Sequence, residues 1–366
     1  MEISLASPNI GEEEARAVYD VVKTGWLNEG IKVECFENNF AEFIGIKYAI
    51  AFFNGTVALH SVLAALNLKP GDEVIVPSFT FNSTANSVIF TGAKPVFADI
   101  DEKTFNLSPD DVNEKISDRT RAIIPVHYGG QAADMKPLCE IADDRNLLVV
   151  EDAAEAHGAT YQNQKVGTFG TAGMFSFTPT KNITTGEGGM ITTNDEKLSE
   201  RLRLLKNHGS SSPYHHIILG YNYRMTEMQA AIGIEQLKKL NMIIDVKRKN
   251  QEYLTKKLSS IHGLTPPFVP ADRKHVYMLY TIKIDEKESG ISRDAFMQKL
   301  EEKGIMTKIY FPPVHMQPYY KEIGYSNQKL PVTEKIYNSV CSLPCHSKLT
   351  KSELDYMVTV IKGIIQ

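Results

Sequence analysis

Lys181 lies in a segment whose composition suits a lysine that reacts with carbonyl compounds. It follows the apolar residues 175–177 and lies among the hydroxyl, amide and glycine residues of the run 178–189. A lysine must be neutral to form a Schiff base, and partial burial or a nearby cation lowers its pKa from the usual value near ~10.4. An exposed lysine in a flexible turn is the alternative for this residue taken alone.

Asp152 is the second residue that could take part in chemistry. Glu151 and Asp152 end an apolar strand, and the small residues Ala153 and Ala154 follow. Because α/β proteins bind ligands at the carboxyl ends of their strands, an aspartate here can pair with a protonated ring nitrogen, as pyridoxal phosphate requires. Capping of the next helix, with Glu155 in its first turn, is the alternative.

Gly55 and Thr56 form a possible phosphate site. A strand ends at residue 53, the glycine permits a tight turn, and a helix follows. The free N–H groups and positive dipole end of a helix N-terminus suit a phosphate, to which Thr56 and Ser176 can each add a hydroxyl donor. A plain turn with Thr56 as N-cap is the alternative. Neither GxGxxG nor GxxxxGK[ST] occurs in the chain.

These three elements together predict a pyridoxal phosphate site. They supply a phosphate cradle, a carboxylate for the ring nitrogen and a lysine, each at the end of a predicted strand. Phe79 follows another strand in the run PSFTF and could lie flat on a pyridine ring. A buried aromatic residue of the core is an equally good interpretation of Phe79.

Alternating short strands and helices must position these residues. The apolar pattern predicts an α/β domain around a mostly parallel sheet. Strands are predicted at residues 48–53, 73–76, 95–98, 122–126, 147–151, 174–177 and 188–194, and helices at 57–66, 82–91, from 108 and at 135–145.

The chain after Lys181 has a different pattern. A long helix is predicted at residues 226–258 with Thr226 as its cap, followed by a strand at 280–285 and helices at 293–304 and from 351. We therefore predict a large α/β domain, residues 1–240, and a smaller α+β domain, residues 241–366.

Composition excludes several classes of protein. The 366 residues are 42% hydrophobic and 23% charged, with a net charge of −4, so neither nucleic acid nor a membrane is an expected partner. Four scattered cysteines predict reduced thiols in a cytoplasmic protein. No signal peptide and no bilayer-spanning run is predicted. His215 and His216 lack a third ligand at useful spacing, so no metal site is predicted.

Several motifs occur in a familiar order. NGTVALH, GDEVIVPSFTF, KPVFADID, EDAAEAHGA, VGTFG, SFTPTKNITTGEGGMITTND and GYNYRMTEMQAAIG resemble those of the DegT/DnrJ/EryC1/StrS family of pyridoxal-phosphate-dependent sugar aminotransferases. The resemblance covers nearly the whole chain. It implies an aspartate-aminotransferase-like fold (fold type I) and a homodimer whose active sites are built from both subunits.

The resemblance also implies a role for each candidate residue. Lys181 would hold the cofactor and move the proton, and Asp152 would keep the ring nitrogen protonated. The position of Glu155 is often glutamine in the family, where it contacts the cofactor's 3'-oxygen. The other cofactor-binding residues implied are Gly55, Thr56 and Ser176 at the phosphate, Phe79 on the ring, and Asn222 reaching the phosphate from the neighbouring subunit.

The family resemblance further implies the substrates. The run TTGEGG, residues 184–189, resembles members that act at carbon 4 of the sugar, which suggests a nucleotide-linked 4-keto-6-deoxy hexose with L-glutamate as amino donor. Glu187 and His315 are candidate substrate-binding residues, and a structural turn is the alternative for His315. The expected role is amino sugar synthesis for a cell-surface polysaccharide. Transfer to carbon 3, transfer to a cyclitol ketone, and a non-catalytic regulatory protein are the alternatives.

Overall fold

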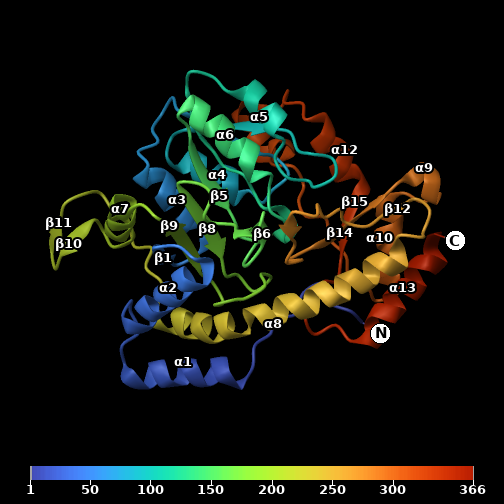
Figure 1. The fold of residues 1–366 in the computed structure, drawn as a ribbon, viewed down its shortest axis with the longest axis horizontal. Coiled ribbons are helices and arrows are strands. Elements are labelled where there is room, and N and C mark those ends of the chain that lie inside the picture. The colour runs from blue at the N-terminus through green and yellow to red at the C-terminus, as the bar shows by residue number, and fades with distance from the viewer. Residues whose placement is uncertain (1, 366) are drawn as a thin grey trace.

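A seven-stranded sheet forms the centre of the structure, a computed structural model that describes residues 2–365 (Figure 1). Strand β9 is antiparallel to both of its neighbours, and the other neighbouring pairs are parallel. This mostly parallel sheet confirms the predicted α/β class. In spatial order the strands are β1 (Tyr48–Phe52), β9 (Gly189–Thr193), β8 (Ala172–Ser176), β5 (Leu148–Asp152), β4 (Thr120–Ile123), β2 (Glu73–Pro77) and β3 (Lys94–Ala98).

Helices cover both faces of this sheet. One apolar cluster packs α2, α6 and α8 against one face, and a second packs α3, α4 and α7 against the other. The strands predicted from apolar runs are buried on both faces, as parallel strands require. The helices of this part are α1 (Glu12–Thr24), α2 (Ile31–Ile44), α3 (Gly55–Ala65), α4 (Ser83–Phe90), α5 (Pro109–Lys115), α6 (Met135–Arg145) and α7 (Glu196–Lys206).

Helix α8 (Glu227–Leu258) connects the large part of the molecule to the smaller C-terminal part (Figure 1). The Thr226 hydroxyl accepts the Gln229 N–H at 3.3 Å, which confirms the predicted cap. The predicted domain boundary at residues 240 and 241 lies inside this continuous helix. Ile3, near the other end of the chain, pairs with Ile305 and packs in the C-terminal cluster. The division into two domains stays a prediction.

The C-terminal part is built on a small antiparallel sheet of β12 (Leu264–Thr265), β14 (Tyr280–Ile284) and β15 (Val340–Leu343). Its apolar side packs against helices that include α10 and α13. The helices here are α9 (Glu286–Ser289), α10 (Arg293–Glu302), α11 (Pro318–Tyr320), α12 (Pro331–Ser339) and α13 (Lys351–Ile365), with short turns η2 (Val314–Met316) and η3 (Lys321–Tyr325).

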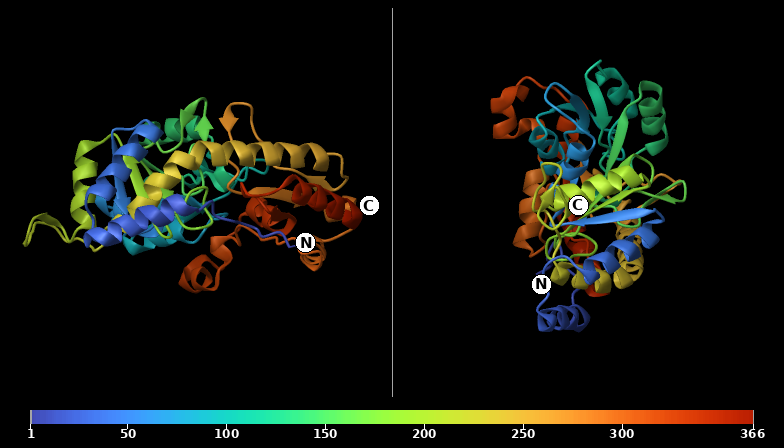
Figure 2. Two further views of the ribbon diagram at one scale, coloured as in Figure 1. Left: turned by 90° about the horizontal axis from the view of Figure 1, so that it is seen from below. Right: turned by 90° about the vertical axis from the view of Figure 1, so that its left-hand side faces the viewer.

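A hairpin of β10 (Ser210–Ser212) and β11 (His215–His216) extends beyond α7, away from the rest of the molecule (Figures 1 and 2). Its turn residue Tyr214 is 98% exposed. The remaining elements are the turn η1 (Tyr128–Gly130) and a small sheet of β13 (Arg273–Lys274), β6 (Thr160–Tyr161) and β7 (Gln164–Lys165). Across residues 2–365, the helices are all too short or too polar to cross a membrane.

Candidate active site

The predicted site residues gather around one cavity of about 690 Å³ at the carboxyl ends of the parallel strands. Asp152 ends β5 and Ser176 ends β8, while Gly55 begins the helix that follows β1. The C-terminal part supplies the other wall with the segment 308–312. Such a volume is in the range of sites that hold a cofactor together with a substrate.

The N-terminus of α3 forms one end of the cavity. Asn54, not Thr56, is the N-cap, because its side chain accepts the Val57 N–H at 3.0 Å. The Thr56 hydroxyl instead contacts that of Ser83 at 2.7 Å. A Cβ added at Gly55 would meet the Cβ of Ser176 at 2.9 Å, so only glycine lets the helix start so close to this serine. The structure thus brings Gly55, Thr56 and Ser176 together.

Asp152 is a buried carboxylate at the floor of the cavity. One oxygen accepts the Thr84 hydroxyl at 2.8 Å and the other accepts the Ala154 N–H at 3.2 Å. Burial raises the pKa of this carboxyl above its ordinary value, and the Thr84 hydrogen bond only partly opposes the effect. A cation placed against Asp152 would offset the cost of keeping it ionised. Thr84 was not predicted, since no local signal connects residues 84 and 152.

Lys181 lies in the same cavity and pairs with Glu155. Its Nζ is 3.2 Å from Glu155 Oε1, while Glu155 Oε2 accepts the Gly129 N–H at 2.8 Å. Both side chains are largely buried, at 13% exposure for Lys181 and 5% for Glu155. The carboxylate therefore connects the lysine to the backbone of η1 and holds it at the cavity wall.

Of the two phenylalanines in the run PSFTF, Phe81 lines the cavity and Phe79 does not. Phe79 is 1% exposed and stacks on Tyr128, with ring centroids 5.1 Å apart. It does not line the cavity, whereas Phe81 does and is 60% exposed. The core position considered for Phe79 is the one observed, and Phe81 is the aromatic ring of this segment that is available to a ligand.

The remaining candidates are distributed differently. Glu187 lines the cavity. His315 is buried away from it, where its Nδ1 lies 2.7 Å from the Ser78 hydroxyl and its Nε2 lies 3.6 Å from Glu334. Asn222 is exposed and pairs with Asn207 outside the cavity of its own chain. A contact of Asn222 with the cofactor therefore needs a second subunit and stays a proposal.

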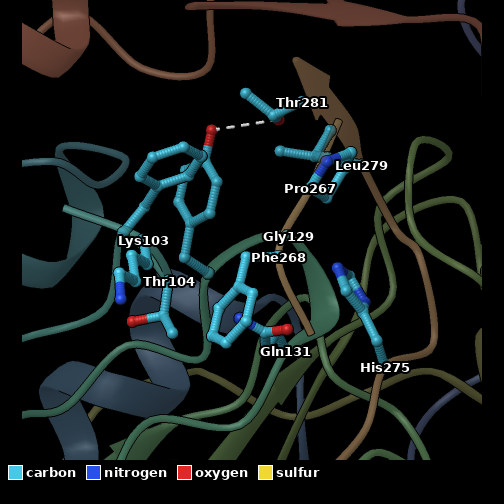
Figure 3. Close-up of a pocket in the computed structure, with 11 residues that line it drawn as sticks. Lys103, Thr104, Gly129, Gln131, Pro267, Phe268, His275, Leu279 and Thr281 are labelled. Atoms are coloured by element: carbon cyan, nitrogen blue, oxygen red, sulfur yellow. Dashed lines mark hydrogen bonds between the residues drawn. The ribbon is translucent and has the colours of Figure 1, made fainter. Parts of the chain in front are cut away.

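A much smaller cavity of about 20 Å³ lies behind Gly129 (Figure 3). Tyr128 and Thr281 meet across it with their hydroxyl oxygens 3.3 Å apart, so the two parts of the molecule are in contact here. The space holds about one water molecule and excludes a sugar. Its lining also includes Lys103, Thr104, Gln131, Pro267, Phe268, His275 and Leu279.

The residues around the large cavity fit pyridoxal phosphate. The helix N-terminus, Thr56 and Ser176 suit a phosphate, because they offer backbone and hydroxyl donors to it. The buried Asp152 suits a protonated pyridine nitrogen, which would supply the missing cation. Lys181 lines the same cavity, so its amine is available to an aldehyde group bound there.

Comparisons with known proteins agree with this geometry. The family model described as "DegT/DnrJ/EryC1/StrS aminotransferase family" matches residues 8–362. The chain is 40% identical over 377 residues to the spore coat polysaccharide biosynthesis protein SpsC of Bacillus subtilis, covering 98% of this chain and 96% of SpsC. It is 40% identical over 367 residues to GDP-perosamine synthase of Caulobacter vibrioides, covering 99% and 98%.

A solved structure shows the same fold. The structure of DesI in the presence of its TDP-sugar product superposes with a TM-score of 0.92 at 31% identity, covering 99% of this chain and 92% of DesI. This likeness confirms the predicted aspartate-aminotransferase-like architecture.

Proposed function

Because the chain belongs to the DegT/DnrJ/EryC1/StrS aminotransferase family and is a pyridoxal-phosphate-dependent sugar aminotransferase, we propose that it aminates carbon 4 of a nucleotide-linked 4-keto-6-deoxy hexose. L-glutamate is the proposed amino donor. The observation that carries the proposal is the single cavity shared by Lys181, Asp152 and the α3 N-terminus. The run TTGEGG, whose Glu187 lines this cavity, supports carbon 4.

Each residue of the site has its own role in the proposed reaction. When bound, pyridoxal phosphate supplies an electron sink that stabilises the charge left on a substrate carbon after a proton is removed. Lys181 removes the α-proton of glutamate and later delivers a proton to the sugar carbon. Asp152 holds the ring nitrogen in its protonated form, and the N–H groups of α3 with Ser176 hold the phosphate. Phe81 covers one face of the ring, the role first considered for Phe79.

The names of two similar proteins support a nucleotide sugar as acceptor. The name of GDP-perosamine synthase indicates a GDP-linked sugar as its product, and the structure of DesI was solved in the presence of its TDP-sugar product. The name of SpsC supports a step in the synthesis of a cell-surface polysaccharide.

The decisive experiment separates the two halves of the reaction. Purified enzyme loaded with pyridoxal phosphate is mixed with glutamate alone, and the change in the cofactor's visible absorbance and the release of 2-oxoglutarate are measured. A panel of 4-keto and 3-keto nucleotide sugars and cyclitol ketones then identifies the acceptor by mass spectrometry and NMR. We expect an amine at carbon 4.

Three other results would contradict the proposal. If only a 3-keto nucleotide sugar is aminated, or only a cyclitol ketone, the acceptor differs from the one proposed. Cofactor binding without any glutamate half-reaction identifies a non-catalytic relative. Lys181→Ala is the inactive control in every arm.

A homodimer with shared sites is part of the same proposal. Large apolar side chains are exposed near the hairpin β10–β11 and the start of α2, which suits an interface. They are Trp26, Leu27, Ile31, Ile217 and Leu219.

Mixed dimers test whether Asn222 acts across the interface. Lys181→Ala and Asn222→Ala chains are each expected to be nearly inactive. If Asn222 serves the partner's site, a mixed dimer contains one intact site of two, and random mixing makes about half of the dimers mixed, so mixing restores up to about a quarter of the activity. Recovery of no activity from dimers shown to be mixed would place Asn222 in its own chain's site or outside both.

A further inference from the structure

One of the two lysines that line the active-site cavity, Lys308, has no role in the proposed reaction. Among the described residues that line it, the acidic side chains are Asp152, Glu155 and Glu187, and the lysines are Lys181 and Lys308. Lys181 pairs with Glu155 and carries the reaction. Lys308 is therefore the lining cation that remains for an anionic part of a substrate.

Lys308 is well placed to present its amine to a ligand. Its backbone N–H donates to the Ser342 carbonyl at 3.3 Å, and its carbonyl accepts the Ser342 N–H at 2.8 Å, which anchors it on the edge of β15. Its Nζ lies 5.3 Å from the centre of the Tyr310 ring. Within residues 2–365 no carboxylate approaches this Nζ to within 4.0 Å. The side chain is exposed, unlike that of Lys181.

We propose that Lys308 binds the diphosphate of the nucleotide-linked sugar and so selects acceptors that carry this group, an inference that rests on the proposed function. In a hexopyranose, carbon 4 lies across the ring from carbon 1, which bears the diphosphate. A keto-sugar whose carbon 4 meets the largely buried Lys181 therefore directs its diphosphate away from Lys181, toward the exposed residues of the cavity lining, which include Lys308. An ammonium group is a suitable point charge for phosphate oxygens.

The amino donor is the competing ligand for Lys308. Glutamate carries two carboxylates and enters the same cavity in the other half of the reaction. A diphosphate contact affects only the sugar half-reaction, whereas a carboxylate contact affects only the glutamate half-reaction. The two assignments therefore predict opposite results in the same variant.

The test compares Lys308→Met with Lys308→Arg. In Lys308→Met we expect the KM for the nucleotide sugar to rise by about 10- to 100-fold, the loss expected when a hydrogen bond to a charged group is removed. The rate and concentration dependence of the glutamate half-reaction, followed by absorbance in single turnovers, should stay within about 2-fold of wild type. Lys308→Arg should retain most of the affinity for the sugar. Lys329→Met, an exposed lysine outside the cavity, is the matched control.

Binding of nucleoside diphosphates gives a readout that does not need turnover. UDP, TDP and GDP are titrated into the cofactor-loaded enzyme by calorimetry, and the nucleotide that binds wild type is used with each variant. We expect Lys308→Met to weaken its binding by about 10-fold or more and to reduce the dependence of binding on salt.

The possible outcomes separate this inference from the proposed function. Unchanged nucleotide binding and sugar KM in a folded Lys308→Met, or a slower glutamate half-reaction alone, overturns the inference. If wild type transfers no amino group but its nucleotide binding still depends on Lys308, the proposed function fails and the diphosphate site stands.

Discussion

Glu151 and Asp152 are neighbours on β5, yet they belong to two very different regions of the molecule. Successive side chains of a strand point to opposite faces of the sheet. Glu151 points to the face covered by α2, α6 and α8 and is fully buried. Its oxygens accept the backbone N–H groups of Gly167, Phe169 and Gly170 at 2.7–3.0 Å, and His127 Nε2 lies 3.0 Å from it.

Asp152 has far fewer partners on its side of the sheet. It accepts one hydroxyl and one backbone N–H and faces the cavity, and burial raises its pKa. A carboxylate whose oxygens are fully used by protein donors holds the fold together, whereas one with spare acceptor capacity and a raised pKa is suited to a ligand. The two regions should therefore respond differently to substitution.

Among the variants considered, Lys181→Ala should lose the most activity while the chain stays folded. Amino transfer should fall by about 10⁴-fold or more, because the group that holds the cofactor and moves the proton is removed. The chain should stay folded, since Glu155 keeps its contact with the Gly129 N–H. Measured turnover and circular dichroism check both parts. Full activity in this variant would refute the assigned site.

Asp152→Asn should lower kcat by about 10²–10³-fold, because a neutral amide no longer favours a protonated ring nitrogen. The free energy of unfolding of the cofactor-free protein should change by no more than about 1 kcal/mol, since burial raises the pKa of Asp152 and so already disfavours its charged form. Urea titration and steady-state kinetics measure the two effects. A large loss of stability with unchanged kcat would reverse the assignment.

Glu151→Gln should behave in the opposite way. Its new NH₂ group would face backbone N–H donors in the fully buried network, so we expect a loss of about 3 kcal/mol in the free energy of unfolding. Activity of the molecules that remain folded should change little by comparison. Urea titration of the cofactor-free protein, with Glu140→Gln on the surface as control, gives the comparison.

The smallest predicted effect is the dependence of stability on pH that arises from His157, which lies on the same side of the sheet as Glu151. His157 packs there among Phe40, Phe175 and Phe177, and burial lowers its pKa to about 3. The unfolded chain takes up this proton below pH about 6.5 while the folded chain does not, so stability falls as the pH falls. At pH 5 the loss from His157 is roughly 2 kcal/mol.

His157→Leu provides the comparison for this pH effect. As the pH falls from 7 to 5, the unfolding free energy of wild type should decrease more than that of His157→Leu. A difference between the two free energies that is independent of pH would show that His157 takes up its proton as readily in the folded chain as in the unfolded chain, and would contradict the lowered pKa.

Much of the fold was predictable because the signals are local. Periodic apolar residues and caps predicted helix α6 at its observed ends and placed the start of α8 correctly at Thr226. Lys181, Asp152 and Ser176 were predicted as site residues because each lies at or just after the end of an apolar strand, and parallel strands bring their carboxyl ends to one edge of the sheet. Helices α1, α2 and α7 were not predicted.

Other parts of the site depend on which way a side chain points. Phe79 and Phe81 are equivalent in the sequence, but only Phe81 faces the cavity. His315 was a candidate substrate-binding residue, yet its ring is buried against Ser78. Thr84 and Lys308 approach the site from distant parts of the chain, so no motif includes them.

The amino-acid sequence by itself predicted the class of fold, the family and two candidate catalytic residues, Lys181 and Asp152. The class of fold and the two candidate residues follow from local periodicity and from residue types at strand ends, whereas the family follows from the resemblance of the motifs. The tertiary structure decided which of two adjacent carboxylates faces the cavity, which of two phenylalanines is free, and which lysine remains for a diphosphate. These choices depend on packing between residues far apart in the chain, where hydrogen bonds and burial are set by three-dimensional neighbours and not by sequence spacing.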